Sequence, residues 1–291
     1  MYKIIEKRKI WFTISLIIIA IGIFTMATKG LEYGLDFKGG TVVEINVGQD
    51  FNKQDVDNIV KKYSSDFQSN KVDNKSISIK AATLSNNDVS GIVKAVKAKY
   101  KKSSLTNQEN IGAVIGQETR TKALQAVIVA IIAMFIYIGI RFELSFGIAA
   151  IISLIHNVLV MLSVYAVLRV PIDSNFIAAA LTVIGYSVHD TIVVFDRIRE
   201  NQKYMRGQEP IVVADASVTQ TLARSINTVL TVVITLTSVY VLVPSVRVFS
   251  EPILIGIITG CYSSICIASP CWVIIKKHML QNKKKLHTVS E

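Results

Sequence analysis

His189 and Asp190 interrupt an otherwise apolar run in the middle of the sequence, IGYSVHDTIVVFDRIREN at residues 184–201. An ionised carboxylate near the centre of a membrane helix costs about 2.5–3.5 kcal/mol on insertion scales, so it must face a bundle interior, a water-filled cavity or a partner. Helical spacing places Thr182 and Tyr186 on or beside the face of Asp190. The position of Asp190 therefore predicts a buried polar site inside a helical bundle.

Two further apolar segments carry polar residues that could line such a site. His156 and Asn157 lie near the middle of one segment, and a second segment carries hydroxyl side chains at helical spacing. These hydroxyls are predicted to form a polar stripe made of Thr228, Thr231, Thr235 and Ser238. Arg224 and Asn227 lie just before the stripe, at its cytoplasmic end. We expect these side chains to form a buried polar core with Asp190.

Two interpretations of Asp190 stay open from its chemistry. In the first, Asp190 is a proton site. An apolar interior favours the neutral carboxyl and a nearby arginine favours the charged carboxylate. Movement of Arg224 or water toward Asp190 and away from it could therefore release a proton from this carboxyl and bind it again. Moving one charge across about 100 mV is worth roughly 2.3 kcal/mol, which shifts a two-state equilibrium about fiftyfold. In the second, Asp190 is a static hydrogen-bonding residue that locks the bundle, as His156 can also be.

The composition indicates a membrane protein. Of the 291 residues, 51% are hydrophobic, and one bilayer crossing takes about 20 apolar residues. The stretch around Asp190, residues 174–195, reaches that length only if the aspartate is tolerated. Five other stretches of spanning length contain no charged residue: Ile10–Thr28, Ala123–Ile140, Leu144–Leu168, Ser225–Val246 and Pro252–Ile275.

Lysine and arginine in the short flanks predict how the spans are oriented. Basic residues gather before Ile10, in 196–224 and after Ile275, whereas the short loops on the opposite side hold only Arg169 and Arg247. We therefore expect both termini in the cytoplasm, which requires an even number of crossings and hence six. The net charge of +11 then reflects attraction to membrane lipids. Nucleic-acid binding is not expected, because no basic segment is interleaved with aromatic residues.

Residues 29–122 are long enough for a domain of their own, and we expect them to be extracytoplasmic. Alternating, β-branched residues predict strands, and apolar residues at helical spacing predict helices. The predicted elements are strand Thr41–Val47, helix Asp55–Tyr63, strand Ser76–Ala82 and helix Asn87–Tyr100. This order predicts a small α/β domain with one sheet, of the ferredoxin-like type.

The sequence contains no phosphate-loop, zinc-protease or nucleophile-elbow motif. Gly39 and Gly40 lack the spacing of a dinucleotide site, and they predict a tight turn or bulge before the first strand. Cys261, Cys266 and Cys271 lie at intervals of five in the last span, where we expect apolar fillers rather than metal ligands. We therefore expect no enzyme activity, no cofactor and no metal.

Several motifs resemble the SecF family, accessory membrane subunits of the bacterial protein-export machinery. The longest are LTVIGYSVHDTIVVFDRIREN at 181–201 and EYGLDFKGGTVVEI at 32–45. IGAVIGQE, IRFELSFGIAA and TQTLARSINT fall in the family's order at 111–118, 140–150 and 219–228. The resemblance implies an α-helical polytopic membrane protein of the resistance-nodulation-division type, with six transmembrane helices and a small α/β domain between the first and second.

The resemblance also implies partners and a role. Family members pair with SecD, dock on the SecYEG channel and use the proton gradient to pull or release translocating polypeptide on the outer face, after the ATPase SecA has pushed it through. By position, Asp190 matches the membrane acid and Arg224 the partnering arginine, with His189 beside the acid. The extracytoplasmic motif contributes Asp36 and the glycine pair Gly39 and Gly40.

Three departures from the family pattern concern the proton route and the coupling ion, proton or sodium. His189 stands where asparagine is usual, Asn157 stands where an aspartate often follows the histidine, and VLVPSVRVFS after the fifth span lacks the familiar glycine pair.

Two other functions stay open. One is a half-transporter that exports a small hydrophobic substrate, and the other is a scaffold that only stabilises a membrane complex.

The expected organisation has four parts, in a multi-pass protein of the plasma membrane. They are the amino terminus with the first transmembrane helix (1–28), the extracytoplasmic domain (29–122), a five-helix bundle (123–275) and a basic cytoplasmic tail (276–291). Pro210–Leu222 is predicted as a separate short helix at the cytoplasmic membrane surface.

Overall fold

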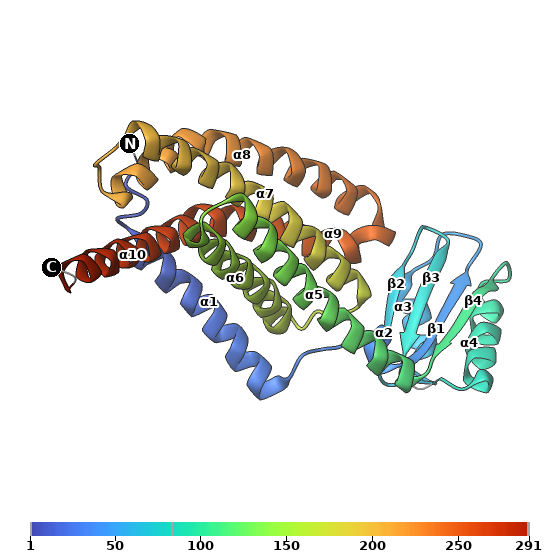
Figure 1. Cartoon of the computed structure of the whole chain (residues 1–291). Helices are drawn as coiled ribbons and strands as arrows, with labels where there is room; N and C mark the ends of the chain where they lie inside the picture. The colour runs from blue at the N-terminus through green and yellow to red at the C-terminus, as the bar shows by residue number, and fades with distance from the viewer. Residues whose placement is uncertain (1, 83, 290–291) are drawn as a thin grey trace.

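The computed structural model describes residues 2–82 and 84–289 and consists of a helical bundle with a small α/β domain at one end (Figure 1). Residues 290 and 291 of the expected basic tail lie outside the described residues. In the described part, six helical segments are long and apolar enough to cross a membrane. They are α1 (Arg8–Lys29), α5 (Ala113–Arg141), α6 (Leu144–Leu168), α7 (Ser174–Tyr204), α8 (Pro210–Leu242) and a last segment, Pro244–Gln281. This last segment runs through a short 3₁₀ turn, α9 (Arg247–Ser263) and η2 (Ser264–Ala268) into α10 (Ser269–Val289).

Helices α6, α7 and α9 form the inside of the bundle, and small residues bring them close together. A Cβ added at Gly256 of α9 would lie 2.4 Å from Cγ2 of Val183 on α7 and 2.9 Å from Sδ of Met161 on α6. Helices in lipid associate through such close packing because the surrounding acyl chains are as apolar as their side chains. The apolar side chains of α1, α5 and α8 are largely exposed, as expected of helices that face lipid.

The α/β domain contains one antiparallel sheet with strand order β2-β3-β1-β4. Its chain order is β1 (Gly40–Asn46), α3 (Lys53–Val60), β2 (Phe67–Lys71), β3 (Ser76–Ala81), α4 (Asn86–Lys99) and β4 (Ser104–Ile111). This βαββαβ arrangement is the ferredoxin-like motif, so the predicted domain type is confirmed. The apolar side chains of β1 and β3 pack with those of α3 and α4 in a single core.

Two strands escaped the sequence prediction because they carry little apolar alternation. Strand β2 reads FQSNK and has a single buried residue, and β4 reads SLTNQENI with nearly every residue exposed. Both lie at the edges of the sheet, where one side of each strand has no neighbouring strand. Their positions are therefore set by pairing with β3 and β1 rather than by burial of their own side chains.

Helix α8 corrects the prediction of a separate helix at Pro210–Leu222. The structure has one continuous helix from Pro210 to Leu242. Proline fits the first turn of a helix, where its missing N–H costs no hydrogen bond, and no further proline or glycine interrupts the helix. The helix ends before the predicted break at Val-Pro-Ser, where a short 3₁₀ turn (η1, Pro244–Val246) precedes α9.

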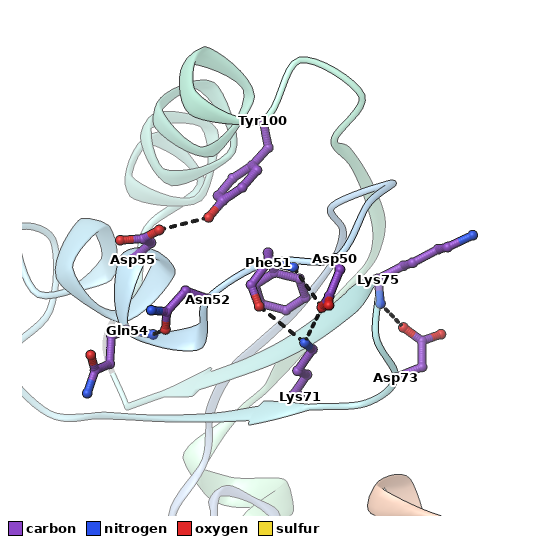
Figure 2. A network of polar contacts seen from close by, with 9 residues as sticks. All are labelled: Asp50, Phe51, Asn52, Gln54, Asp55, Lys71, Asp73, Lys75 and Tyr100. Carbon is purple, nitrogen blue, oxygen red and sulfur yellow. Dashed lines mark hydrogen bonds and ion pairs between the residues drawn. The ribbon is translucent and has the colours of Figure 1, made fainter.

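Polar contacts join α3 to the end of α4, and the loop before α3 to β2 (Figure 2). The hydroxyl of Tyr100 donates to Oδ2 of Asp55 at 2.9 Å, and Lys99 pairs with Oδ1 of the same carboxylate at 2.8 Å. Nζ of Lys71 donates to Oδ1 of Asp50 at 2.7 Å. The side chain of Asn52 caps the first turn of α3. These contacts hold α3 beside α4 and fix the start of α3 near β2.

Candidate functional site

Asp190 lies in the middle of α7 and is 2% exposed. Its Oδ2 has no hydrogen-bond partner among the described residues, and the same holds for Oγ of Ser187, one turn earlier on the helix. Burying an ionised group without a partner costs far more than burying a neutral one. A carboxyl placed in this way has the chemistry to take up a proton when buried and to release it when water or a cation reaches it.

Asn157 connects α6 to α9 beside this site. Its Oδ1 accepts a hydrogen bond from the hydroxyl of Thr259, and its Nδ2 donates to the carbonyl oxygen of Gly256 at 3.3 Å. A Cβ added at Gly260 would lie 3.2 Å from both Nδ2 of Asn157 and Oγ of Ser187. Helices α6, α7 and α9 therefore meet at Gly260, with Asn157 and Ser187 facing the same point.

The π-helical turn η2 adjoins the next turn of α7. The hydroxyl of Thr191 donates to the carbonyl oxygen of Ser187 at 2.9 Å and shares a 2.8 Å hydrogen bond with the hydroxyl of Ser264, the first residue of η2. Single π turns inside α-helices are rare and occur frequently at functional sites. Asp190 therefore lies between two contacts that join α7 to the last span.

His156 is buried on α6, and neither ring nitrogen has a hydrogen-bond partner in the part of the chain that is described. Its ring centroid lies 6.0 Å from that of Tyr262. The hydroxyl of Tyr262 donates to the carbonyl oxygen of Trp11 at 2.7 Å and shares a 3.0 Å hydrogen bond with Ser15, both on α1. His156 therefore packs against Tyr262 of α9, which bonds to α1, whereas Asn157 bonds to Thr259 and Gly256 of α9.

The other predicted site residues form no hydrogen bond or ion pair with Asp190 in the described part of the chain. The hydroxyl of Tyr186 donates to the carbonyl oxygen of Thr228 on α8 at 3.3 Å. Thr182 is exposed and bonds only to its own helix, and His189 is exposed although it precedes Asp190. Arg224 is exposed on α8 and forms no ion pair with Asp190 in residues 2–82 and 84–289. The structure thus brings neither His189 nor Arg224 into contact with the carboxylate.

The predicted polar stripe of α8 does not line this site, which corrects the expectation of a buried polar core. Thr231, Thr235 and Ser238 are exposed, and Thr228 is only half-buried. All four hydroxyls donate to carbonyl oxygens of α8 itself. Serine and threonine can satisfy themselves in this way inside a helix, so their spacing alone did not show which side of α8 faces the bundle.

Asp36 and the glycine pair lie where the α/β domain meets the bundle. Oδ2 of Asp36 accepts a hydrogen bond from the backbone N–H of Ser174, the first residue of α7, at 3.2 Å. Gly39 and Gly40 have positive φ angles of 80° and 145°, and a Cβ added at Gly39 would lie 2.8 Å from the backbone nitrogen of Ala113 at the start of α5. Gly39 ends the short helix α2 (Leu35–Lys38) and Gly40 begins β1, so the pair makes the predicted turn into this strand.

Several residues of the site escaped the sequence prediction. Ser264 and Thr259 contact α7 and α6, but isolated hydroxyls in an apolar span give no signal of their own. The small residues Gly256 and Gly260 did carry one, because GIITG is a GxxxG pattern typical of closely packed membrane helices. Asp215 was also missed; it is buried near the start of α8 and accepts the backbone N–H of Ile5 at 2.8 Å.

Two family models match the sequence. The model of the SecD/SecF GG motif matches residues 24–50, and the model of the C-terminal part of the protein export membrane protein SecD/SecF matches residues 92–278, more than half of the chain. The chain belongs to the SecD/SecF family. The predicted resemblance is therefore confirmed, and with it a role in protein translocation, a multi-pass membrane location and the overall fold. Nothing in this family membership indicates catalysis.

Individual relatives agree with this assignment. The protein translocase subunit SecF of Sebaldella termitidis is 34% identical over 94% of this chain and 92% of its own length. SecF of Haemophilus influenzae is 36% identical over 91% of this chain and 83% of its own length. The subunit SecDF of Bacillus subtilis is 34% identical over 95% of this chain, which spans 38% of that longer protein.

A solved structure has the same fold. The crystal structure of SecDF, a translocon-associated membrane protein from Thermus thermophilus, superimposes with a TM-score of 0.82 at 29% sequence identity. The match covers 95% of this chain and 39% of the SecDF chain. This chain therefore corresponds in fold to about two fifths of SecDF.

Proposed function

We propose that this chain acts with a SecD partner and uses the proton gradient to promote late steps of polypeptide translocation on the outer face of the membrane. The observation that carries the proposal is the buried Oδ2 of Asp190, which has no hydrogen-bond partner in the described residues. Among the described residues, no group of three histidine, cysteine or acidic side chains is placed to hold a metal ion. A single unpartnered carboxyl oxygen is enough to hold a proton, so we take the proton as the coupling ion, with sodium as the alternative.

The exposed side of α8 supports association with SecD. Arg224, Asn227 and the hydroxyl stripe lie on the outside of a helix that crosses the membrane, where polar groups are costly against lipid. Interfaces between membrane helices are enriched in small and hydroxylated residues. Relatives such as SecDF of Bacillus subtilis are longer single chains that contain a region similar to this one. We assign this face of α8 to the SecD interface.

Arg224 enters the proposed cycle through movement of α8 along α7. The two helices are joined by the bond from Tyr186 to Thr228, four residues beyond Arg224. A slide of α8 changes the distance between the guanidinium and the carboxylate of Asp190, which favours proton release when they are close and proton uptake when they are apart.

Helix α7 would carry this change to the outer face. Asp190 lies sixteen residues after Ser174 on the same helix, which is about 24 Å at 1.5 Å per residue. At Ser174 the helix meets Asp36, and at Ile172 the preceding loop bonds to Gly34 at 2.8 Å. Movement of α7 thus reaches the α/β domain, which we place outside the cytoplasm, with both termini inside, where it contacts polypeptide leaving SecYEG after SecA has acted.

Reconstitution with SecD, SecYEG and SecA in vesicles tests the proposal. Export of a precursor is measured with and without a proton gradient, for the wild type and for Asp190→Asn. We expect the variant to insert and to bind SecD normally but to lose the stimulation by the gradient. Asp215→Asn is the matched control, because it removes another buried carboxylate of the bundle and leaves Asp190 intact.

Two results would contradict the proposal. Full gradient-stimulated export by Asp190→Asn would indicate a scaffold, and transport of a small hydrophobic compound by the chain alone would indicate a half-transporter. Replacing the proton gradient with a sodium gradient identifies the coupling ion. Arg224→Lys adds a second test: lysine keeps the charge but lacks the planar guanidinium, so coupling should weaken, and unchanged proton flux would argue against a specific Arg224 role.

A further inference from the structure

A cavity of about 490 Å³ lies between α5, α6, the start of α7 and the segment that follows α1. It is separate from the Asp190 site, because its lining includes none of the residues that surround Asp190. The floor is apolar and includes Val127 of α5, Leu162 of α6 and Ala180 of α7, while the outer end carries Arg120 and Tyr33. Cavities of this size bind small molecules in many proteins.

The cavity runs from the level of the lipid headgroups into the hydrocarbon region. Arg120 precedes by three residues the apolar stretch that begins at Ala123, and Val127 follows one turn into it. Seven residues of helix separate Arg120 from Val127, about 10 Å at 1.5 Å per residue. The charged and aromatic end therefore lies at the membrane boundary, where tyrosine and arginine are favoured, and the apolar end lies deeper.

Arg120 is the charged group that selects the occupant. Its guanidinium lies 4.1 Å from the centroid of the Tyr33 ring and it forms no ion pair within the described ranges 2–82 and 84–289. By contrast, Arg169 and Lys38 both pair with Glu32. The planar fork of arginine fits a phosphate group, so the open end of the cavity is suited to an anion.

We propose that this cavity binds one phospholipid of the outer leaflet. The phosphate group lies on the guanidinium of Arg120, beside the Tyr33 ring, and one acyl chain lies against Val127, Leu162 and Ala180. A lipid matches both halves of the cavity, because it joins a negative headgroup to an apolar chain across the same boundary. The lipid supports the first turns of α7 through Phe176 and Ala180.

Photo-crosslinking in vesicles tests this site. The full chain is inserted into vesicles that contain phosphatidylglycerol with a photoreactive group in one acyl chain, and the labelled peptides are mapped by mass spectrometry. We expect labelling of α5 and α6 near Val127 and Leu162. Arg120→Gln should lower that labelling about tenfold or more, the effect of losing one hydrogen bond to a charged group. Lys122→Gln removes the same charge from an exposed position on the same helix and should leave the labelling unchanged.

Two further arms separate the phospholipid from other occupants. Ala123→Phe places a ring at the cavity wall and should also reduce labelling, and a diacylglycerol probe with the same chains but no phosphate should label weakly. The proposal is overturned if Arg120→Gln labels as strongly as the wild type, or if the phosphate-free probe labels equally well. It is also overturned if, in the complex with SecD, a SecD helix crosslinks to Leu124 and excludes the lipid. Asp190→Asn should label like the wild type, so this result is independent of proton coupling.

Discussion

Asp36 and Ser174 join the α/β domain to the helix that carries Asp190, through a hydrogen bond from the backbone N–H of Ser174 to Oδ2 of Asp36 at 3.2 Å. The N-cap residue Asp173 accepts a second bond from the N–H of Phe176 at 3.0 Å. Two carboxylates, one from each part of the protein, thus satisfy the first turn of α7, where negative charge is favourable. Displacement of α7 must therefore move or break a contact with the domain.

Asp36→Ala is expected to weaken this connection. Loss of one hydrogen bond of this kind costs about 1 kcal/mol, and we expect gradient-stimulated export to fall while proton exchange at Asp190 continues. Asp36→Asn keeps an oxygen acceptor at the same position and should retain most of the activity. Export and proton flux are measured in the same vesicles. Unchanged export with Asp36→Ala would show that the domain receives movement by another route.

Gly39→Ala is expected to destabilise the junction between the domain and α5. Its φ of 80° is a conformation nearly restricted to glycine, which costs other residues about 1–3 kcal/mol, and its Cβ would also lie 2.8 Å from the backbone of Ala113. Gly30→Ala is the matched control, because Gly30 has a φ of 68° but no atom within 4 Å of the added Cβ. Hydrogen exchange of β1 and the first turns of α5 should rise clearly more for Gly39→Ala. Equal exchange in both variants would exclude the clash.

The sequence was sufficient for features that depend on local composition. Long apolar stretches located all six spanning helices, because a bilayer imposes a minimum length on each. Helix α6 has the predicted bounds Leu144–Leu168, whereas α5 starts at Ala113, ten residues before the predicted Ala123. That extension lies beyond the apolar stretch and is fixed by its packing with α2 (Leu35–Lys38) and the glycine pair, which no local pattern records.

Features that depend on which helix faces which could not be predicted. Asp190 and Asn157 were identified as polar residues inside spans, but Gly260, which lies against Asn157 and Ser187, belongs to a helix about 70 residues further along the chain than Asp190. The α8 hydroxyls were expected inside and lie outside, because hydroxyls bonded to their own helix fit either environment. Which face of a helix is buried depends on the helices that pack against it. For α8, we propose that one of these packing partners belongs to another protein, SecD.

The α/β domain is expected to lose stability in acid through Asp55. Hydrogen bonds from Lys99 and from the hydroxyl of Tyr100 hold the pKa of Asp55 below its usual value. A carboxyl whose pKa is lower in the folded than in the unfolded state stabilises the fold above its ordinary pKa, and that stabilisation is lost as the pH falls through the folded value. Asp55→Asn should therefore reduce protection of α3 and α4 near neutral pH and flatten its dependence on pH below about 4.

Hydrogen exchange of α3 and α4 in the full chain, corrected for the intrinsic rate at each pH, measures this effect. Asp73→Asn is a suitable control, because the pKa of Asp73 is also lowered, but by a hydrogen bond from the backbone N–H of Lys75 within its own turn. That control should leave the contact between α3 and α4 unchanged. Equal pH profiles for the wild type and Asp55→Asn would contradict the assigned role.

Gly256→Ala is expected to disturb both the packing of the bundle and the Asp190 site. The added methyl would lie 2.4 Å from Val183 and 2.9 Å from Met161, and overpacking of this kind costs about 1–3 kcal/mol. The carbonyl oxygen of Gly256 accepts a hydrogen bond from Asn157 at 3.3 Å. A shift of α9 would therefore also move the side chain of Asn157, which faces Ser187, one turn before Asp190 on α7.

Gly185→Ala is the matched control for this prediction. Gly185 lies on α7 with no atom within 4 Å of an added Cβ, and alanine favours a helix over glycine, so this variant should be as stable as the wild type or slightly more so. Thermal unfolding in detergent compares the two, and export in vesicles shows whether coupling falls together with stability. If both variants unfold at the same temperature, α9 can shift to accommodate the methyl group at residue 256. The close approach of the three inner helices would then not limit the stability of the protein. If only stability falls and gradient-stimulated export is retained, the Asn157 contact is structural and the proton site does not depend on it.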